Sequence, residues 1–387
     1  MHNNPYPSPT FPRRRALLLA LAAAPAAALA QNSNNNGGGR GDILVGRTTP
    51  LSGGMAPFMQ PIHLGQEAAI DDFNAQGGIG GRKVRLVTLD DGFNPKRAVE
   101  NAHALGDKEG VVALFGVVGT SQVLGVLPYL AEARLPLISV YTGSPAIRAQ
   151  ASPYLFTTRA SYADELVKIV RNLVAVQSLR IAVAYENNDF GKLLLPLVEK
   201  VIPAEGATLI GSHSLDSTGK DAADAAKALA KLNPHVVLMI AAGPPVVAYM
   251  RANKEHLGVP VYTLSLGAGA AVLKALGDDA RGLAVARTGP SPTKPTLQLT
   301  RDFQASMKRR GHAVDYDHFT GYMDARVLIE GLKAAGPGVT RASLAQAMEG
   351  LGRLDLGGFT YQFGPQNRHG SNYVDIAVVS SGGVYRQ

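Results

Sequence analysis

The sequence of 387 residues contains no cysteine and no tryptophan, and aromatic residues make up only 6% of it. Without cysteine the chain forms no disulfide bond, has no cysteine nucleophile and offers no cysteine for lipid attachment at a mature N-terminus. Its cores must therefore be built from Ala, Val, Leu and Ile. Charged residues are also few, at 18%, against 46% hydrophobic residues, which is the balance of a folded globular protein. The length favours two domains.

Enzyme signatures are absent as well. The nine histidines are scattered, and the chain has no HExxH metal motif, no Walker loop and no Gly-x-Ser-x-Gly elbow. The glycine-rich segment Gly77–Gly81 follows a predicted helix, Gly65–Gln76, and precedes a strand, which is the reverse of a dinucleotide-binding loop. Asp315, Asp317 and His318 cluster, but a helix cap explains them more simply than a metal site. We expect no catalytic residue, no metal and no cofactor.

The N-terminus has the pattern of an export signal. Three arginines, Arg13–Arg15, precede the apolar run Ala16–Leu29, which ends in the small-x-small pattern Ala28-Leu29-Ala30. These features predict a signal peptide over residues 1–30, cleaved near Ala30. A membrane anchor is the alternative, but the run is shorter than the ~20 residues that span a bilayer. Adjacent arginines also fit a twin-arginine signal, so the export route stays open.

The net charge does not favour nucleic acid as a partner. Cleavage removes three arginines and no acid, so the formal net charge falls from +8 to +5. The remaining charges are dispersed, and no basic stretch is interleaved with aromatic residues. The next segment, residues 31–41, is rich in Asn and Gly and predicts a flexible leader. We expect ordered structure to begin at Asp42.

Short apolar runs alternate with amphipathic segments along the rest of the chain. Such runs suit strands buried on both faces of a parallel sheet that is flanked by helices. Helical spacing marks Tyr162–Gln177, and Asn94-Pro95 reads as a helix cap followed by proline in the first turn. The alternation occurs twice, with a break near Phe156–Ala160, which predicts an α/β fold of two similar lobes. The predicted strands are Ile43–Val45, Val84–Leu89, Val111–Phe115, Leu137–Val140, Arg180–Tyr185, Val236–Ile240, Val259–Leu264 and Leu283–Ala286.

Several blocks in order resemble the leucine/isoleucine/valine-binding protein family, the type I periplasmic solute receptors of ABC importers. The opening block contains PLSGG (50–54), AIDDFN (69–74), GGIGGRKV (77–84) and Asp90-Asp91. Later blocks are LFGVVGTSQ (114–122), RLPLISVYTGSP (134–145), RIAVAYENNDFG (180–191), NPHVVLMIAAG (233–243), LGGFTYQFGPQNRHG (356–370) and YVDIAVV (373–379). The resemblance covers essentially the whole mature chain.

The resemblance implies two Rossmann-like lobes joined by three hinge crossings, near residues 157–160, 287–290 and 356–358. Lobe 1 would comprise residues 42–158 plus 289–356, and lobe 2 residues 159–288 plus 357–387. It also implies a monomeric periplasmic receptor that closes on a small-molecule ligand and docks on a membrane permease. Two alternatives remain: a sensory receptor for a membrane signalling partner, and an enzyme on the same scaffold.

Loops after the strands of lobe 1 supply the first candidate ligand contacts, since ligands of open α/β sheets bind beyond the carboxyl ends of strands. Phe58 aligns with a family aromatic residue, although a core position would also suit it. Gly119, Thr120 and Ser121 begin a predicted helix, where free N–H groups and a hydroxyl group suit an anion. Ordinary helix capping by Thr120 or Ser121, which needs no ligand, is the alternative. Tyr141 would stack on a flat ligand or merely pack, and the family's threonine is displaced there by one position. The candidates are Phe58, Gly119, Thr120, Ser121, Tyr141, Thr142 and Gly143.

Lobe 2 would supply Tyr162, Phe190, Ala242, Ser265, Leu266 and Gly267. In amino-acid-binding relatives the loop after the equivalent of Val259–Leu264 carries an acid for the ligand's ammonium group. Here Ser265–Ala270 contains no acid, and a buried ammonium without a carboxylate partner costs several kcal/mol. We therefore expect an amino acid or a less polar carboxylate, including an aromatic one, as the ligand. Glu186 or Asp189 are the alternative sources of negative charge.

Overall fold

The computed structural model describes residues 41–380 and 385–386, all within one compact unit. The predicted signal peptide and all but the last residue of the predicted leader lie outside the described residues. No helix in the described part of the chain is long and apolar enough to cross a membrane.

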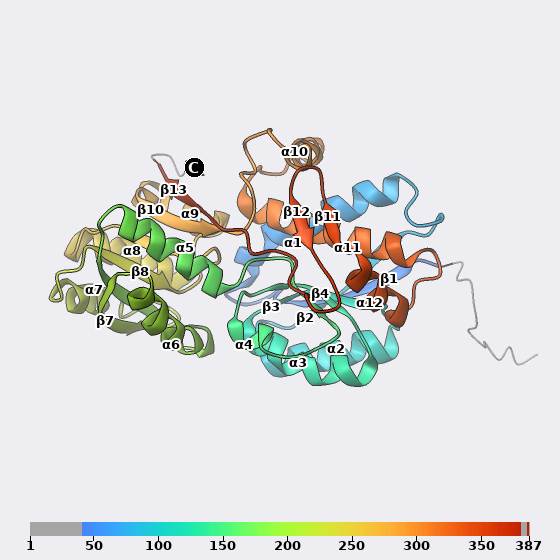
Figure 1. Cartoon of the computed structure of the whole chain (residues 1–387), viewed down its shortest axis with the longest axis horizontal. Coiled ribbons are helices and arrows are strands. Elements are labelled where there is room, and N and C mark those ends of the chain that lie inside the picture. Colours follow the sequence, from blue (N-terminus) through green and yellow to red (C-terminus); the bar gives the residue numbers. More distant parts are fainter. Residues whose placement is uncertain (1–40, 381–384, 387) are drawn as a thin grey trace, which may run out of the picture. The chain divides into compact units, whose positions relative to one another are not determined.

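The first sheet contains five parallel strands in the order β2-β1-β3-β4-β5 (Figure 1). Each strand is followed by a helix or turn that returns the chain to the same end of the sheet, as the alternating sequence pattern predicts. The strands are β1 (Ile43–Thr49), β2 (Val84–Asp90), β3 (Ala113–Val118), β4 (Leu137–Tyr141) and β5 (Leu155–Phe156).

Helices cover both faces of this sheet. One face packs on α1 and α11, and the other packs on α2 and α3. Asn94 caps α2 as predicted, because its side chain accepts hydrogen bonds from the N–H groups of Lys96 and Arg97. The helices around the first sheet are α1 (Ala56–Ala75), α2 (Pro95–His103), the π-helix η1 (Ala104–Lys108), α3 (Thr120–Ala133), α4 (Pro145–Arg148), α10 (Gln298–Arg310), α11 (Tyr316–Ala335) and α12 (Arg341–Gly350).

Glycines let α1 and α11 approach closely. A Cβ atom on Gly65 would lie 1.9 Å from the carbonyl oxygen of His318, and one on Gly321 would lie 2.0 Å from that of Ile62. Because any side chain at either position meets backbone, the two helices touch only if both residues stay glycine. This contact fixes the start of α1, which borders the cavity described below.

The second sheet has seven strands in the order β14-β13-β10-β9-β8-β6-β7. Its strands are parallel from β10 to β7, while β13 and β14 are antiparallel to their neighbours. The strands are β6 (Arg180–Glu186), β7 (Thr208–Leu215), β8 (Val236–Ile240), β9 (Val261–Thr263), β10 (Leu283–Arg287), β13 (Asp375–Val379) and β14 (Tyr385–Arg386). The helices around it are α5 (Tyr162–Ala175), α6 (Asp189–Ala204), α7 (Ala222–Ala230), α8 (Pro244–His256), α9 (Ala270–Leu276) and the 3-10 helix η2 (Gly277–Ala280).

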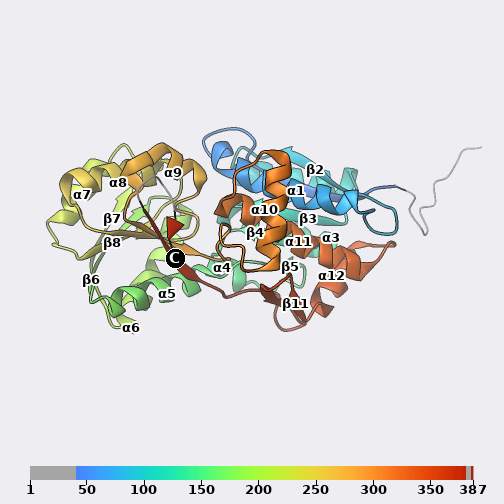
Figure 2. The same ribbon diagram turned by 90° about the horizontal axis from the view of Figure 1, so that it is seen from above.

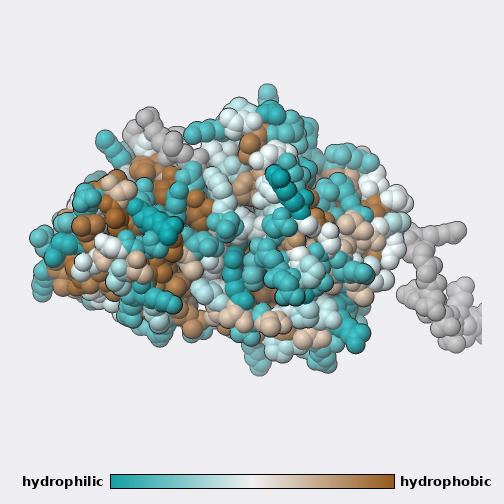
Figure 3. All heavy atoms as spheres, in the orientation of Figure 1, coloured by the Kyte–Doolittle hydropathy of each residue, from teal (hydrophilic) through white to brown (hydrophobic). Residues whose placement is uncertain are grey.

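Apolar side chains pack on both faces of the second sheet too. On the face shown in Figure 3, more apolar atoms reach the surface around the second sheet than around the first. Among the residues in and next to these elements, Val176, Leu193 and Val378 are exposed. Single exposed apolar residues of this kind are ordinary in a folded protein.

The chain passes between the sheets three times, so each of the two lobes is discontinuous in sequence (Figure 2). The segment between β10 and β13 returns to the first lobe, where it forms α10, α11 and α12. It then forms a small two-stranded sheet of β11 (Arg353–Asp355) and β12 (Thr360–Gln362).

The third crossing differs from the sequence expectation. Phe359, Tyr361 and Phe363 pack in the core beneath the first sheet, so the chain has not left that lobe at residues 356–358. His369 and Gly370 then pair with Thr157 of the first crossing. We therefore propose that lobe 1 comprises residues 42–158 plus 289–363, and that the third crossing lies between residue 364 and β13.

Candidate ligand-binding cavity

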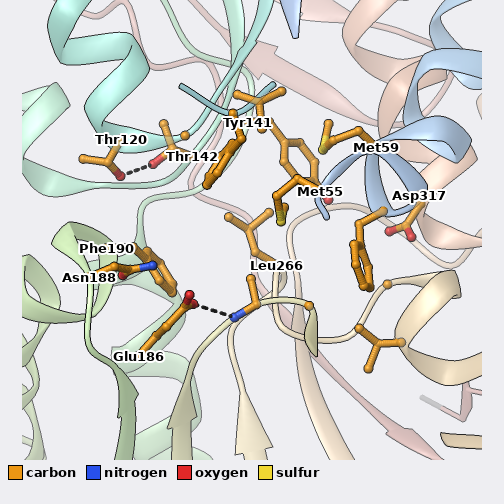
Figure 4. Close-up of a pocket in the computed structure, with 18 of the residues that line it drawn as sticks. Met55, Met59, Thr120, Tyr141, Thr142, Glu186, Asn188, Phe190, Leu266 and Asp317 are labelled. Carbon is orange, nitrogen blue, oxygen red and sulfur yellow. Dashed lines mark hydrogen bonds between the residues drawn. The ribbon is translucent and has the colours of Figure 1, made fainter. Parts of the chain in front are cut away.

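One cavity lies where the strands of both sheets end (Figure 4). It contains about 770 Å³ of space, including its open mouth. Loops after β3, β4, β6 and β8 border it, as expected for ligand sites of open α/β sheets. The lining residues are Met55, Phe58, Met59, Phe93, Val118, Gly119, Thr120, Tyr141, Thr142, Tyr162, Glu186, Asn188, Phe190, Ala242, Gly243, Leu266, Gly269, Val272 and Asp317.

The structure brings nine of the predicted contact residues together around this cavity. From the first lobe come Phe58, Gly119, Thr120, Tyr141 and Thr142, and from the second come Tyr162, Phe190, Ala242 and Leu266. The remaining four, Ser121, Gly143, Ser265 and Gly267, do not line it.

Two hydroxyl groups form a polar corner of the cavity. The side chains of Thr120 and Thr142 share a hydrogen bond of 3.0 Å, and the N–H of Ser144 donates to Thr142 Oγ1 at 3.2 Å. Gly119 precedes α3 with φ of 96°, and a Cβ there would lie 2.2 Å from the Gln122 side chain. Glycine at 119 is therefore what lets the chain turn from β3 into the helix beside the cavity.

Ser121 and Gly143 contact protein instead of the cavity. The hydroxyl group of Ser121 donates to Asp189 Oδ2 at 2.7 Å, which connects α3 in the first lobe to α6 in the second. Gly143 lies against the start of α5, where its carbonyl oxygen accepts from the N–H of Tyr162 at 2.8 Å. Both residues shape the cavity edge without facing it.

Ser265 and Gly267 belong to a buried layer beneath the cavity floor. Ser265 donates from its N–H and its hydroxyl to the two oxygens of Glu165, at 2.7 and 2.8 Å, and accepts from Arg159 Nη2 at 2.6 Å. Gly267 is folded so tightly that a Cβ would lie 2.0 Å from Thr263 Oγ1. Between them, only Leu266 reaches the cavity.

Most of the remaining lining is apolar. Met55 precedes the first residue of α1 and Met59 lies in its first turn, while Val272 comes from α9. Phe190 packs edge to face on Tyr162 with ring centroids 5.4 Å apart. Sequence reasoning missed the methionines because it placed the helix start at Gly65, nine residues after the structure does.

Two buried carboxyl groups lie on opposite sides of the cavity, Glu186 at the end of β6 and Asp317 at the start of α11 (Figure 4). Glu186 is 7% exposed, and burial raises its pKa. Asp317 is 4% exposed, and burial, reinforced by Asp315, raises its pKa to about 6. Asp315 caps α11 by accepting from the N–H groups of Asp317 and His318, which confirms the predicted cap.

The nearest guanidinium groups lie behind the lining. Arg159 packs against the ring of Tyr141, with its central carbon 4.8 Å from the ring centroid. Arg287 lies between the rings of Tyr316 and Tyr385, at 4.3 and 4.2 Å. Both side chains border a separate, smaller space that shares Tyr141 and Asp317 with the main cavity. Within the described residues, no group of three or more His, Asp or Glu side chains is arranged to hold a metal ion.

Comparison with known proteins identifies the family to which the chain belongs. The family model described as "Periplasmic binding protein" matches residues 42–384. The chain belongs to this family. Among curated relatives, "Leu/Ile/Val-binding protein homolog 8" of Brucella abortus (strain 2308) is 23% identical over 353 residues, which covers 85% of this chain and 86% of the relative.

Solved structures of periplasmic binding proteins share the two-lobed fold. A substrate-binding periplasmic protein from Ralstonia solanacearum is 29% identical with a TM-score of 0.82, covering 89% of this chain and 99% of that one. A branched chain amino acid ABC transporter structure from Thermus thermophilus with bound valine has a TM-score of 0.80 at 16% identity, over 89% and 94% of the two chains. The predicted family and the type I periplasmic binding protein fold are thereby confirmed.

Proposed function

We propose that this periplasmic binding protein is the solute receptor of an ABC importer. It captures a small organic solute, an amino acid or a related compound, and presents it to a membrane permease. The observation that carries the proposal is the cavity, because strand-end loops of both lobes line it with residues that the sequence had marked for ligand contact. The valine-bound Thermus thermophilus structure with the same fold supports this assignment.

Closure of the lobes on the solute follows from this lining. A solute in the cavity would touch Thr120 and Tyr141 of the first lobe together with Phe190 and Leu266 of the second. Such a solute stabilises the arrangement in which both sets of contacts exist, by its difference in affinity between the open and closed states. A permease that recognises only the closed receptor then receives loaded protein.

The proposal includes a periplasmic, monomeric and non-catalytic protein. The names of the family and of the relatives, which are binding proteins, support the periplasmic location and the binding role. Sensing through a membrane signalling partner remains the second candidate function. Loss of solute uptake on deletion of the gene, with permease and ATPase genes beside it, would favour transport. Unchanged uptake together with loss of a transcriptional response would favour sensing.

A thermal-shift screen of amino acids, amines and small carboxylates tests the binding function. A ligand at 100 times its Kd adds about 2.7 kcal/mol to the stability of the folded state. For the ligand found, Thr120→Ala should weaken binding about fivefold to tenfold, which corresponds to one lost hydrogen bond of about 1 kcal/mol. Thr208→Ala, at an exposed position on β7, is the matched control and should leave Kd unchanged. Equal affinities for the two variants would remove Thr120 from the site.

A further inference from the structure

The charges around the cavity are unbalanced. Among the described residues that line it, two carry carboxyl groups, Glu186 and Asp317, and none is Arg, Lys or His. Arg159 does not line the cavity, and its central guanidinium carbon lies 4.8 Å from the ring centroid of Tyr141, which does. Arg287 is held between two tyrosine rings and donates to the carbonyl oxygen of Ala268 at 2.8 Å. The charged side chains that border the cavity directly are therefore acidic, and both guanidinium groups lie outside its lining.

Of the two acids, Glu186 lacks a compensating cation. Its carboxylate accepts one long hydrogen bond of 3.4 Å from the N–H of Ala242 and one from the hydroxyl of Ser217, and the nearby Asp216 adds further negative charge. No ion pair reaches it within the described part of the chain. Asp317 differs, because Arg287 lies near it and the N–H of Ala270 donates to it at 2.6 Å. Glu186 is thus a buried acid without a cationic partner in the protein, and it lines the cavity, where a solute could supply that partner.

Some of the donors that would hold an anionic solute are already engaged by the protein. The N–H of Gly119 donates to the carbonyl oxygen of Tyr141 at 3.4 Å. The hydroxyls of Thr120 and Thr142 share one hydrogen bond, which uses one of their two protons, and Ser121 donates to Asp189. The carboxylate of Asp189 also lies at the N-terminus of α3, where the helix dipole attracts negative charge. A protein carboxylate thereby takes up part of the attraction that a solute carboxylate would need.

The rest of the lining suits a positive charge. Phe58, Phe93, Tyr141, Tyr162 and Phe190 surround the space, together with the thioethers of Met55 and Met59. The faces of aromatic rings attract cations, and polarisable sulfur packs well around alkyl groups next to a charged nitrogen. Aromatic lining and unpaired acid therefore favour the same kind of guest.

We propose that the solute is an organic cation, an amine or a quaternary ammonium compound, whose charged nitrogen binds Glu186, and that a carboxylate group is not its anchor. This inference rests on the proposed receptor function and specifies its solute class. It also moves the partner of the nitrogen from the loop after β9, which has no acid, to the end of β6.

Isothermal titration of the full-length mature protein with matched solutes tests the class. Phenethylamine and 3-phenylpropanoate carry the same phenethyl group and differ in the sign of the charged group attached to it. Isopentylamine and 4-methylpentanoate form a second pair of this kind. Each amine should bind at least ~10-fold more tightly than its acid, the size of effect expected for a buried charge that gains a partner. Acids that bind as tightly as the amines, or more tightly, overturn the inference and leave the receptor function intact. If no amine, acid or amino acid binds to folded protein, the receptor function fails together with it.

A variant assigns the effect to one residue. Glu186→Gln should weaken amine binding at least ~10-fold and leave acid binding equal or improved, because it removes the charge and keeps the shape. Glu199→Gln, an exposed position on α6, is the matched control and should bind amines like the wild type. Amine affinity that survives Glu186→Gln unchanged contradicts the assignment. Should Glu186→Gln fail to fold, the comparison of amines with acids on the wild-type protein still decides the solute class.

Discussion

The hydrogen bond between Ser121 and Asp189 allows a sharp test of how the two lobes cooperate. It joins α3 to α6 at 2.7 Å, and neither side chain lines the cavity. Ser121→Ala removes this link without touching the solute. A hydrogen bond of this kind contributes about 1 kcal/mol, and its exposed position does not favour a larger value. If solute binding requires the lobes to meet, the observed Kd should rise about fivefold.

A double-mutant cycle separates this explanation from direct solute contact. Kd is measured by calorimetry for the wild type, Ser121→Ala, Asp189→Ala and the double variant. If the link acts as described, the double variant binds no worse than either single variant, with a coupling free energy of about 1 kcal/mol. A Ser121 that touched the solute would weaken binding again in the Asp189→Ala background. Additive losses, or no loss in either single variant, would refute the reasoning.

Two further predictions concern folding stability. Gly65→Ala should reduce the free energy of unfolding by about 3 kcal/mol in urea denaturation, since its Cβ meets backbone of α11, whereas Gly338→Ala, with no atom nearby, should change it little. Burial raises the pKa of Asp324 to about 6, above its unfolded value. Between about pH 4 and pH 6 the unfolded chain therefore ionises Asp324 while the folded protein keeps it protonated, so stability falls as pH rises through this range. Asp324→Asn should flatten that part of the stability curve by about 3 kcal/mol, and an unchanged slope would show that Asp324 ionises normally.

The fold followed closely from local patterns. All eight predicted strands exist, because continuous apolar runs such as Val236–Ile240 are what a sheet covered on both faces requires. Of the strands that were not predicted, β7 is the longest; it lies at the sheet edge and is only half buried, so its sequence Thr208–Leu215 mixes polar and apolar residues without a clear period. Likewise, the proposal of a later third crossing rests on Phe359 and Tyr361, which resemble any other apolar pair in the sequence and pack beneath the first sheet in the structure.

Site residues could be predicted from the sequence where the position of the backbone alone brings them to the cavity. Strand ends bring Thr120, Thr142 and Ala242 to the cavity, and strands can be located from sequence. Side-chain direction cannot be located in this way. Ser121 follows Thr120 and yet turns to Asp189, and Ser265 precedes Leu266 and yet turns to Glu165. Asp317 was interpreted only as a cap residue, since its place beside the cavity depends on how α11 packs.

The sign of the charge that lines the cavity is the property that the sequence predicts least well. Arg159 and Arg287 lie on the two crossings that the chain makes next to the cavity, and neither lines it. The ring of Tyr141 lines the cavity and lies against Arg159, whose central carbon is 4.8 Å from the ring centroid. Glu186 lines the cavity itself, so a chain with an excess of basic residues places a carboxyl group at the cavity wall. Under the proposed assignment, selectivity depends on which charges a side chain covers, as much as on which charges are present.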